Sequence, residues 1–216
     1  MLIVFAMLGA ILDCLILYGS ILFLNKKYEL NLTKGKYLIE AKSFWGVFIL
    51  NFIVVVIYSI YRYSLDGSWR YMLFVLSVAY MGILALTDLH KLVIPNIVIV
   101  VALAVWIVII SISLLTDIEA GMEVLGVSLG GGLCAGIAFL MCYFVSRRTL
   151  GGGDIKMAAV LGLYVGGQYI LLTLFAGIFV CAIYSVVMLI RKKITLKDGV
   201  PLAPFLYLGT IVTLLF

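Results

Sequence analysis

Charged residues are scarce in this chain. Asp, Glu, Lys and Arg make up 12% of its 216 residues, whereas hydrophobic residues make up 66%. Soluble domains carry about 25% charged residues, so this chain cannot present a wet surface on all sides. Long apolar runs recur along its whole length, and a lipid bilayer admits such runs as helices. The sequence therefore predicts an all-α polytopic membrane protein.

Cysteine and histidine are also rare. The four cysteines all lie inside apolar segments and show no CxxC spacing, and the single histidine, His90, has no second ligand at a suitable distance along the chain. We therefore interpret Cys14, Cys134, Cys142 and Cys181 as small buried hydrophobic residues. We expect neither a metal site nor another cofactor.

Eight apolar segments divide the chain, and no soluble domain of useful size is left between them. They cover approximately residues 2–24, 44–61, 71–86, 97–115, 124–145, 155–165, 169–190 and 202–216. Because a full span needs about 20 residues, the sixth segment is short. It is either a half-helix or continues through the glycines at 166–167. We predict a single transmembrane domain over residues 1–216 with about eight helices.

The charged loops predict an orientation. Thirteen of the fifteen Lys and Arg residues lie in alternate connections, at 25–43, 90–91, 147–156 and 191–197. Cytoplasmic loops of membrane proteins carry such an excess of basic residues. This pattern explains the net charge of +5 without a nucleic-acid partner. It predicts an outside N-terminus, and it predicts that Asp88 and Asp154 lie at the cytoplasmic ends of their segments.

These two aspartates are the candidate catalytic residues. An ionisable residue in or near the hydrocarbon region is costly and is a functional candidate by default, although a solvated aspartate at a helix end is the simpler alternative. Each aspartate has non-helical sequence beside it: Gly151, Gly152 and Gly153 precede Asp154, and Pro95 and Asn96 follow Asp88. Two such sites at one depth favour a shared function.

A carboxyl pair in one site can activate water. The two groups cannot both ionise cheaply, so they hold one proton between them. One carboxyl then takes a proton from water while the other protonates the scissile carbonyl oxygen. Asp154 opens a predicted helix, with Lys156 nearby, and Asp88 closes one. The helix dipoles therefore favour Asp154 as the anion by about 0.3–1 kcal/mol each.

Two further features carry no catalytic prediction. In the fifth segment, Gly126/Gly130 and Gly132/Gly136 have GxxxG spacing, which indicates close helix packing in membranes. A third intramembrane carboxyl, Asp13, fits a protonated structural residue better than a proton path, because nothing near it in sequence resembles a relay.

Three stretches resemble the prepilin peptidases, the type IV leader peptidases of bacterial pilus, secretion and competence systems. Asp88 with Ile94-Pro95-Asn96 is similar to that family's first aspartate motif. Residues 151–162, GGGDIKMAAVLG, resemble its GxGD motif, and residues 201–206, PLAPFL, resemble the start of its last helix. The three motifs occur in the same order as in this family, and together they span more than half of the chain.

The resemblance implies a GxGD-type aspartyl protease of the plasma membrane, with Asp88 and Asp154 as catalytic residues. It implies cleavage at the cytoplasmic face of prepilin or pseudopilin substrates, after the glycine that ends a short basic leader and before a hydrophobic helix. Many family members carry a cysteine-rich insertion linked to N-methylation of the product. The basic loop 25–43 contains no cysteine, which argues against methyltransferase activity.

Two alternatives stay open. A presenilin-like or signal-peptide-peptidase-like protease shares the GxGD motif. The pattern of that group has a Tyr-Asp pair in the preceding helix, whereas here Thr87 precedes Asp88. A small ion or proton transporter, or a membrane scaffold, would use the aspartates for ion binding and the glycines only for packing.

Overall fold

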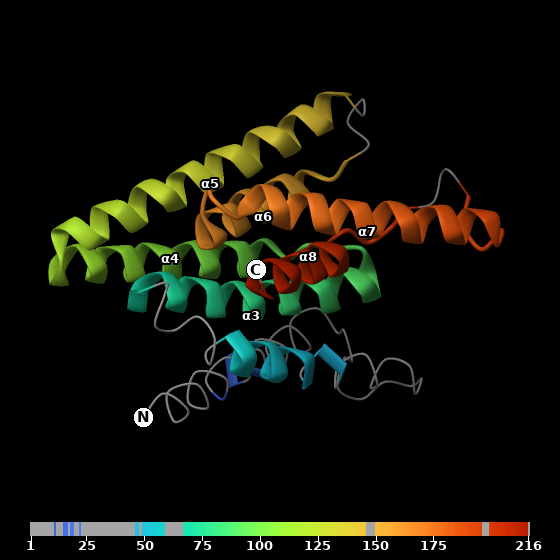
Figure 1. Cartoon of the computed structure of the whole chain (residues 1–216). Coiled ribbons are helices and arrows are strands. Elements are labelled where there is room, and N and C mark those ends of the chain that lie inside the picture. Colours follow the sequence, from blue (N-terminus) through green and yellow to red (C-terminus); the bar gives the residue numbers. More distant parts are fainter. Residues whose placement is uncertain are drawn as a thin grey trace.

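The computed structural model describes residues 67–145, 150–195 and 199–215 without a break. It also describes residues 46–47 and 49–58 and positions 11, 15, 16, 18, 19 and 22. Throughout these residues all regular secondary structure is helical (Figure 1), which confirms the all-α prediction. The loop 25–43, Asp13 and most of the first predicted segment lie outside the described residues.

Six helices correspond to the third to eighth predicted segments. They are α3 (Gly67–Lys91), α4 (Asn96–Thr116), α5 (Ile118–Val145), α6 (Gly152–Val165), α7 (Ile170–Ile190) and α8 (Ala203–Leu215). A shorter apolar helix covers Ile49–Tyr58 in the second predicted segment. The 14-residue α6 ends before Gly166, whose φ of 81° is a left-handed conformation that favours glycine. The sixth segment is therefore a short helix that does not continue through the glycines.

Four of the described helices are long and apolar enough to cross a membrane. They are α4, α5, α7 and the Trp69–Lys91 part of α3. Large apolar side chains such as Leu133 of α5 and Phe175 of α7 are more than 60% exposed, as expected for surfaces that lipid covers. The eight crossings and the outside N-terminus stay predictions.

The central helix of the bundle is α3, which packs against α4, α6 and α8. Its inner side chains, including Val78, Met81 and Leu84, are fully buried. Buried polar groups need partners in such a core, and the buried amide of Asn51 accepts a 2.6 Å hydrogen bond from the Tyr207 hydroxyl of α8. This bond ties the Ile49–Tyr58 helix to the rest of the bundle.

The closest helix pair is α5 with α6, and glycines make that contact. A Cβ atom on Gly131 would collide with the carbonyl oxygen of Gly162, and one on Gly132 would lie 2.6 Å from the Leu163 side chain. A Cβ atom on Gly126 or Gly130 would have no atom of the described residues within 4 Å. The prediction of GxxxG packing is therefore wrong for Gly126/Gly130, because these two glycines do not point at α6.

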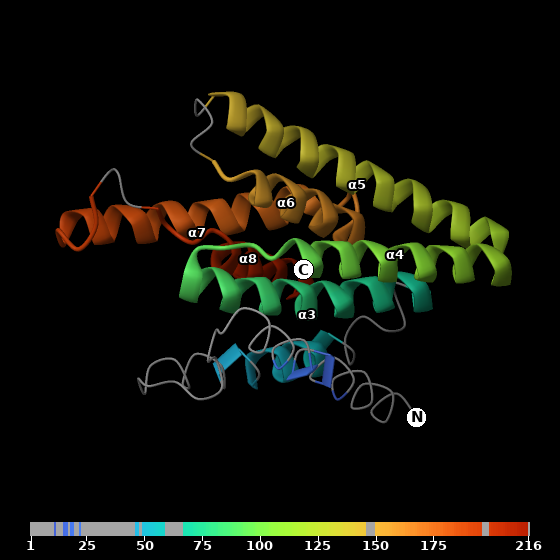
Figure 2. The same cartoon turned by 180° about the vertical axis from the view of Figure 1, so that it is seen from behind.

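Successive helices run in opposite directions. The final turns of α3, α5 and α7 therefore lie at the same end of the bundle as the first turns of α4, α6 and α8 (Figure 1; Figure 2 shows the reverse side). Asp88 and Asp154 both lie at this end. At the opposite end, Arg70 of α3 donates a 2.8 Å hydrogen bond to Gln168 and lies 3.9 Å from Glu123 of α5.

Candidate active site

Asp88 lies in the last turn of α3 and is 5% exposed. Its Oδ2 atom accepts a 3.0 Å hydrogen bond from the backbone N–H of Ala203, the first residue of α8. Sequence reasoning missed this contact. The only signal for it was the unassigned motif at residues 201–206.

The chain leaves the helix soon after Asp88. Leu92 has a left-handed φ of 52°, and its N–H closes the helix on the Asp88 carbonyl oxygen at 2.9 Å. Residues 93–95 are non-helical, and Pro95 caps α4, which begins at Asn96. A proline suits this place because it lacks an N–H and fixes φ near −65°. Asp88 therefore lies beside non-helical backbone, as expected.

Asp154 occupies the first turn of α6, and the preceding glycines differ from expectation. Gly151 is the N-cap, but Gly152 and Gly153 are already helical, so the prediction of non-helical sequence before Asp154 is wrong for these two glycines. The Gly151 N–H donates to Asp154 Oδ2 at 3.2 Å, and the Asp154 N–H donates to the Gly151 carbonyl at 3.0 Å. These two bonds satisfy groups that a helix start leaves open, which explains why the helix includes the glycines.

Two of the three glycines allow close approach. A Cβ atom on Gly151 would lie 3.0 Å from Asp154 Oδ2, and one on Gly153 would lie 3.1 Å from the Cβ atom of Ile94. Gly152 has free space around it. The glycine at 153 thus lets the start of α6 pack against the connection between α3 and α4, which follows Asp88.

The two carboxyl groups are close enough to act on each other. Asp154 belongs to the short helix α6, which is not among the four candidate membrane spans. Burial, followed by the negative charge of Asp88, raises the pKa of Asp154 to about 6, and the Gly151 N–H opposes this shift. Burial and the neighbouring negative charge thus both favour the protonated form of Asp154.

Two tyrosines anchor α6 against its neighbours. The Tyr164 hydroxyl donates a 2.6 Å hydrogen bond to the Ala102 carbonyl of α4, and Tyr80 of α3 donates a longer bond, 3.4 Å, to the Met157 carbonyl. The two rings stack with their centroids 6.1 Å apart. Since Met157 lies one turn after Asp154, these contacts fix the position of the catalytic candidate relative to α3.

Lys156 and Asn96 lie at the rim of the site. The Lys156 ammonium is 3.5 Å from the Asn96 amide oxygen, and both residues are exposed. Within the described part of the chain, no hydrogen bond joins either of them to Asp88 or Asp154. Their predicted supporting role would therefore concern an incoming molecule rather than the resting pair.

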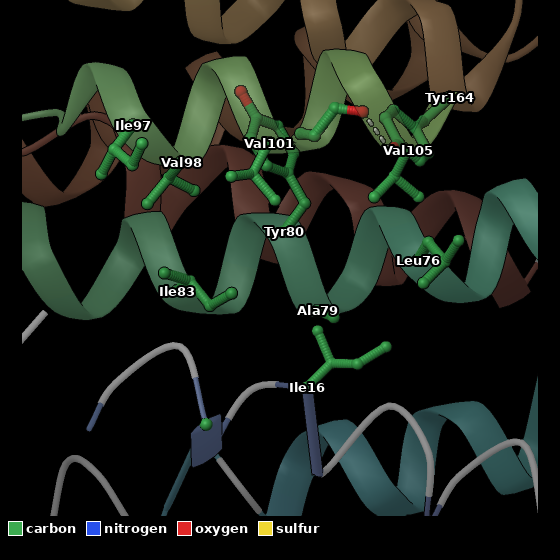
Figure 3. Close-up of a pocket in the computed structure, with 12 residues that line it drawn as sticks. Ile16, Leu76, Ala79, Tyr80, Ile83, Ile97, Val98, Val101, Val105 and Tyr164 are labelled. Atoms are coloured by element: carbon green, nitrogen blue, oxygen red, sulfur yellow. Dashed lines mark hydrogen bonds between the residues drawn. The ribbon is translucent and has the colours of Figure 1, made fainter. Parts of the chain in front are cut away.

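An apolar cavity of about 390 Å³ lies between α3 and α4 on the same side of the molecule as Ile16. Figure 3 shows Leu76, Ala79 and Ile83 of α3 and Val101 and Val105 of α4 around it. Ile83 is little more than one helical turn before Asp88. Neither Asp88 nor Asp154 is among the residues that line the cavity.

No group of three or more His, Cys, Asp and Glu side chains is placed to hold a metal ion within the described ranges. The Nε2 atom of His90 is buried and has no hydrogen-bond partner among the described residues.

Comparison with known proteins points to one family. A sequence model of the type IV leader peptidase family matches residues 71–186, which include both aspartates. Over 143 residues the chain is 28% identical to a prepilin leader peptidase/N-methyltransferase of Bacillus subtilis (strain 168). That match covers 66% of this chain and 54% of the relative, so the chain spans about half the length of the curated relative. No solved structure matches the chain.

Proposed function

The chain belongs to the type IV leader peptidase family, and on that premise we propose that it is a membrane aspartic endopeptidase. It removes the short basic leader from prepilin-like precursors, with Asp88 and Asp154 as the catalytic pair. The observation that carries this proposal is that Asp88, in the last turn of α3, and Asp154, in the first turn of α6, lie at the same end of two helices that pack together.

The pair hydrolyses the peptide bond with one shared proton. The ionised carboxyl takes a proton from water as the water oxygen attacks the scissile carbonyl carbon. The protonated carboxyl gives its proton to the carbonyl oxygen. When the tetrahedral intermediate breaks down, the leaving nitrogen takes the first proton and the second carboxyl recovers its own. Every step uses groups of this chain and one water molecule.

The substrate combines a basic leader with an apolar helix. The similarity to the prepilin leader peptidase/N-methyltransferase of Bacillus subtilis supports a prepilin-like precursor. The apolar cavity beside α3 suits the hydrophobic residues of such a precursor, because ligand pockets of this size are lined mainly by apolar side chains. The loop 25–43 contains no cysteine, so we propose peptidase activity without N-methyltransferase activity.

The active site faces the cytoplasm in this proposal. Basic residues lie at the same end of the bundle as the two aspartates: Lys91 ends α3, and Arg191, Lys192 and Lys193 follow α7. An excess of basic residues in short loops is typical of the cytoplasmic side of a plasma-membrane protein. The bilayer and the precursor are then the two partners of the enzyme.

A reconstituted cleavage assay tests the proposal. The protein in liposomes is mixed with a precursor made of a basic leader, a glycine and an apolar helix, and mass spectrometry locates the cut. We expect wild type to cut after the glycine, and Asp88→Asn and Asp154→Asn each to abolish cleavage.

The matched control is Asp117→Asn. Asp117 lies at the opposite end of α4, where its side chain accepts a bond from the Ala120 N–H at 3.1 Å, and an asparagine retains that acceptor. This variant should cleave like wild type. Cleavage by both active-site variants at the wild-type rate would overturn the proposal.

A further inference from the structure

The start of α8 points a backbone donor at Asp88. Of the first N–H groups in this helix, those of Phe205 and Leu206 bond to the Leu202 carbonyl at 3.1 Å. Pro204 has no N–H. The Ala203 N–H is therefore the remaining donor of the first turn, and it bonds to Asp88 Oδ2 at 3.0 Å.

We propose that this turn, residues 201–204, is a positioning element that holds Asp88 as the ionised member of the pair. Asp88 is then the general base, and Asp154 is the proton donor. This inference rests on the proposed protease function and assigns a role to each carboxyl within it. The motif at residues 201–206, to which the sequence alone gave no catalytic role, thereby acquires one.

The contacts of the two carboxyls differ in a way that favours Asp88 as the anion. Hydrogen bonds to a charged acceptor are stronger than those between neutral groups, and the Ala203 bond is buried, whereas the 3.2 Å Gly151 bond of Asp154 is exposed. The sequence argument for Asp154 as the anion counted only the dipole of the helix that carries each residue. The structure adds the positive end of α8 beside Asp88.

Packing holds the donor turn in place. Ala203 and Leu206 are fully buried. A Cβ atom on Gly177 of α7 would lie 2.9 Å from the Phe205 carbonyl oxygen, so α7 and α8 approach each other closely behind this turn. Farther along, the hydroxyls of Thr173 and Thr213 form a buried 2.8 Å hydrogen bond between the same helices. The packing of α7 and α8 therefore fixes the position of the Ala203 N–H relative to the Asp88 carboxylate.

The role assignment fixes the path of each proton. Asp88 removes a proton from water as the new C–O bond forms, and the proton on Asp154 moves to the carbonyl oxygen. As the C–N bond breaks, Asp88 passes its proton to the leaving nitrogen, and Asp154 takes one back from the collapsing intermediate. Both carboxyls end in their starting states, so no co-reactant is needed.

Deleting one N–H tests the inference. Ala203→lactic acid, introduced by nonsense suppression, replaces an amide by an ester and removes the donor without changing the side chain. We expect kcat to fall about tenfold to a hundredfold while KM is unchanged, because the lost bond holds a charged group. The control is the same ester exchange at Leu208, which is 39% exposed and leaves the Ala203 donor in place. It should leave kcat near wild type.

Infrared spectroscopy of the wild-type protein gives a second, independent result. At neutral pH the difference between wild type and Asp88→Asn should show a carboxylate band for Asp88, and no carboxylic-acid band. An acid band for Asp88 would overturn the inference, as would an ester variant with wild-type kcat. If wild type fails to cleave, or Asp88→Asn still cleaves, the proposed function itself has failed instead.

Discussion

The Asp154 carboxyl interacts with the Gly151 N–H at the start of its own helix and with the negative charge of Asp88 on α3. The Gly151 N–H is a local partner that any helix start can supply, whereas Asp88 reaches it only because α3 and α6 meet. The titration of Asp154 is therefore a direct report on tertiary structure at the site.

Removing the neighbouring charge should lower the pKa of Asp154. Asp88→Asn keeps the size of the side chain but ends the repulsion that helps raise the pKa of Asp154 to about 6. With a lower pKa, Asp154 gains its charge at lower pH than in wild type. Carbon-13 NMR of labelled aspartate in lipid discs measures the shift. A titration that Asp88→Asn leaves unchanged would show that the groups do not interact.

Both catalytic candidates could be predicted from the sequence because each is a carboxyl at the edge of an apolar run with helix-breaking residues beside it. The donor on Ala203 could not be predicted in that way. Its side chain is a methyl group, and the chemistry lies in a backbone N–H that becomes available only when the start of α8 packs against the end of α3. Local sequence patterns do not show which helix ends pack against each other.

At the scale of helices, the fit of α6 between α3, α4 and α5 determines where Asp154 lies. Tyr164 binds α4, Tyr80 binds α6, and Gly131 and Gly162 bring α5 and α6 into contact. The sequence predicted α6 but left open whether it is a half-helix or continues through the glycines at 166–167. It identified glycines in α5 as packing residues, but a GxxxG spacing does not determine which side of the helix meets a partner.

The glycine contact between α5 and α6 makes a prediction about stability. Gly131→Ala and Gly162→Ala should each lower the free energy of unfolding by about 1–3 kcal/mol, because the added methyl group meets backbone of the facing helix. Denaturant unfolding in mixed micelles measures this change.

Gly130→Ala is the matched control, since it lies on the same helix with no atom within 4 Å of the added Cβ. An alanine there should leave stability unchanged or raise it slightly. Equal stability of Gly131→Ala and Gly130→Ala would contradict the described helix contact.

At the scale of the whole molecule, the antiparallel helices collect the candidate catalytic residues and several basic connections at one end. Sequence alone predicted this arrangement because loop charge alternates along the chain. The side of the membrane to which that end belongs is a separate prediction. It depends on charge bias and not on any helix contact.

Site-specific labelling tests the orientation. In a background from which the four native cysteines have been removed, Lys192→Cys should react with an impermeant thiol reagent only from the cytoplasmic side. Gln168→Cys, in the turn between α6 and α7 at the opposite end of the bundle, should react only from outside. The reverse pattern would place the carboxyl pair on the outer face and contradict a cytoplasmic active site.

The central claim is that Asp88 and Asp154 form one catalytic unit, and single-turnover cleavage rates of three variants test it most directly. Groups that act as a unit lose nearly all activity when either one is removed, so their effects do not add. We predict that Asp88→Asn, Asp154→Asn and the double variant cleave the leader precursor at the same residual rate. Substantial cleavage by either single variant, with a further loss in the double variant, would contradict the account.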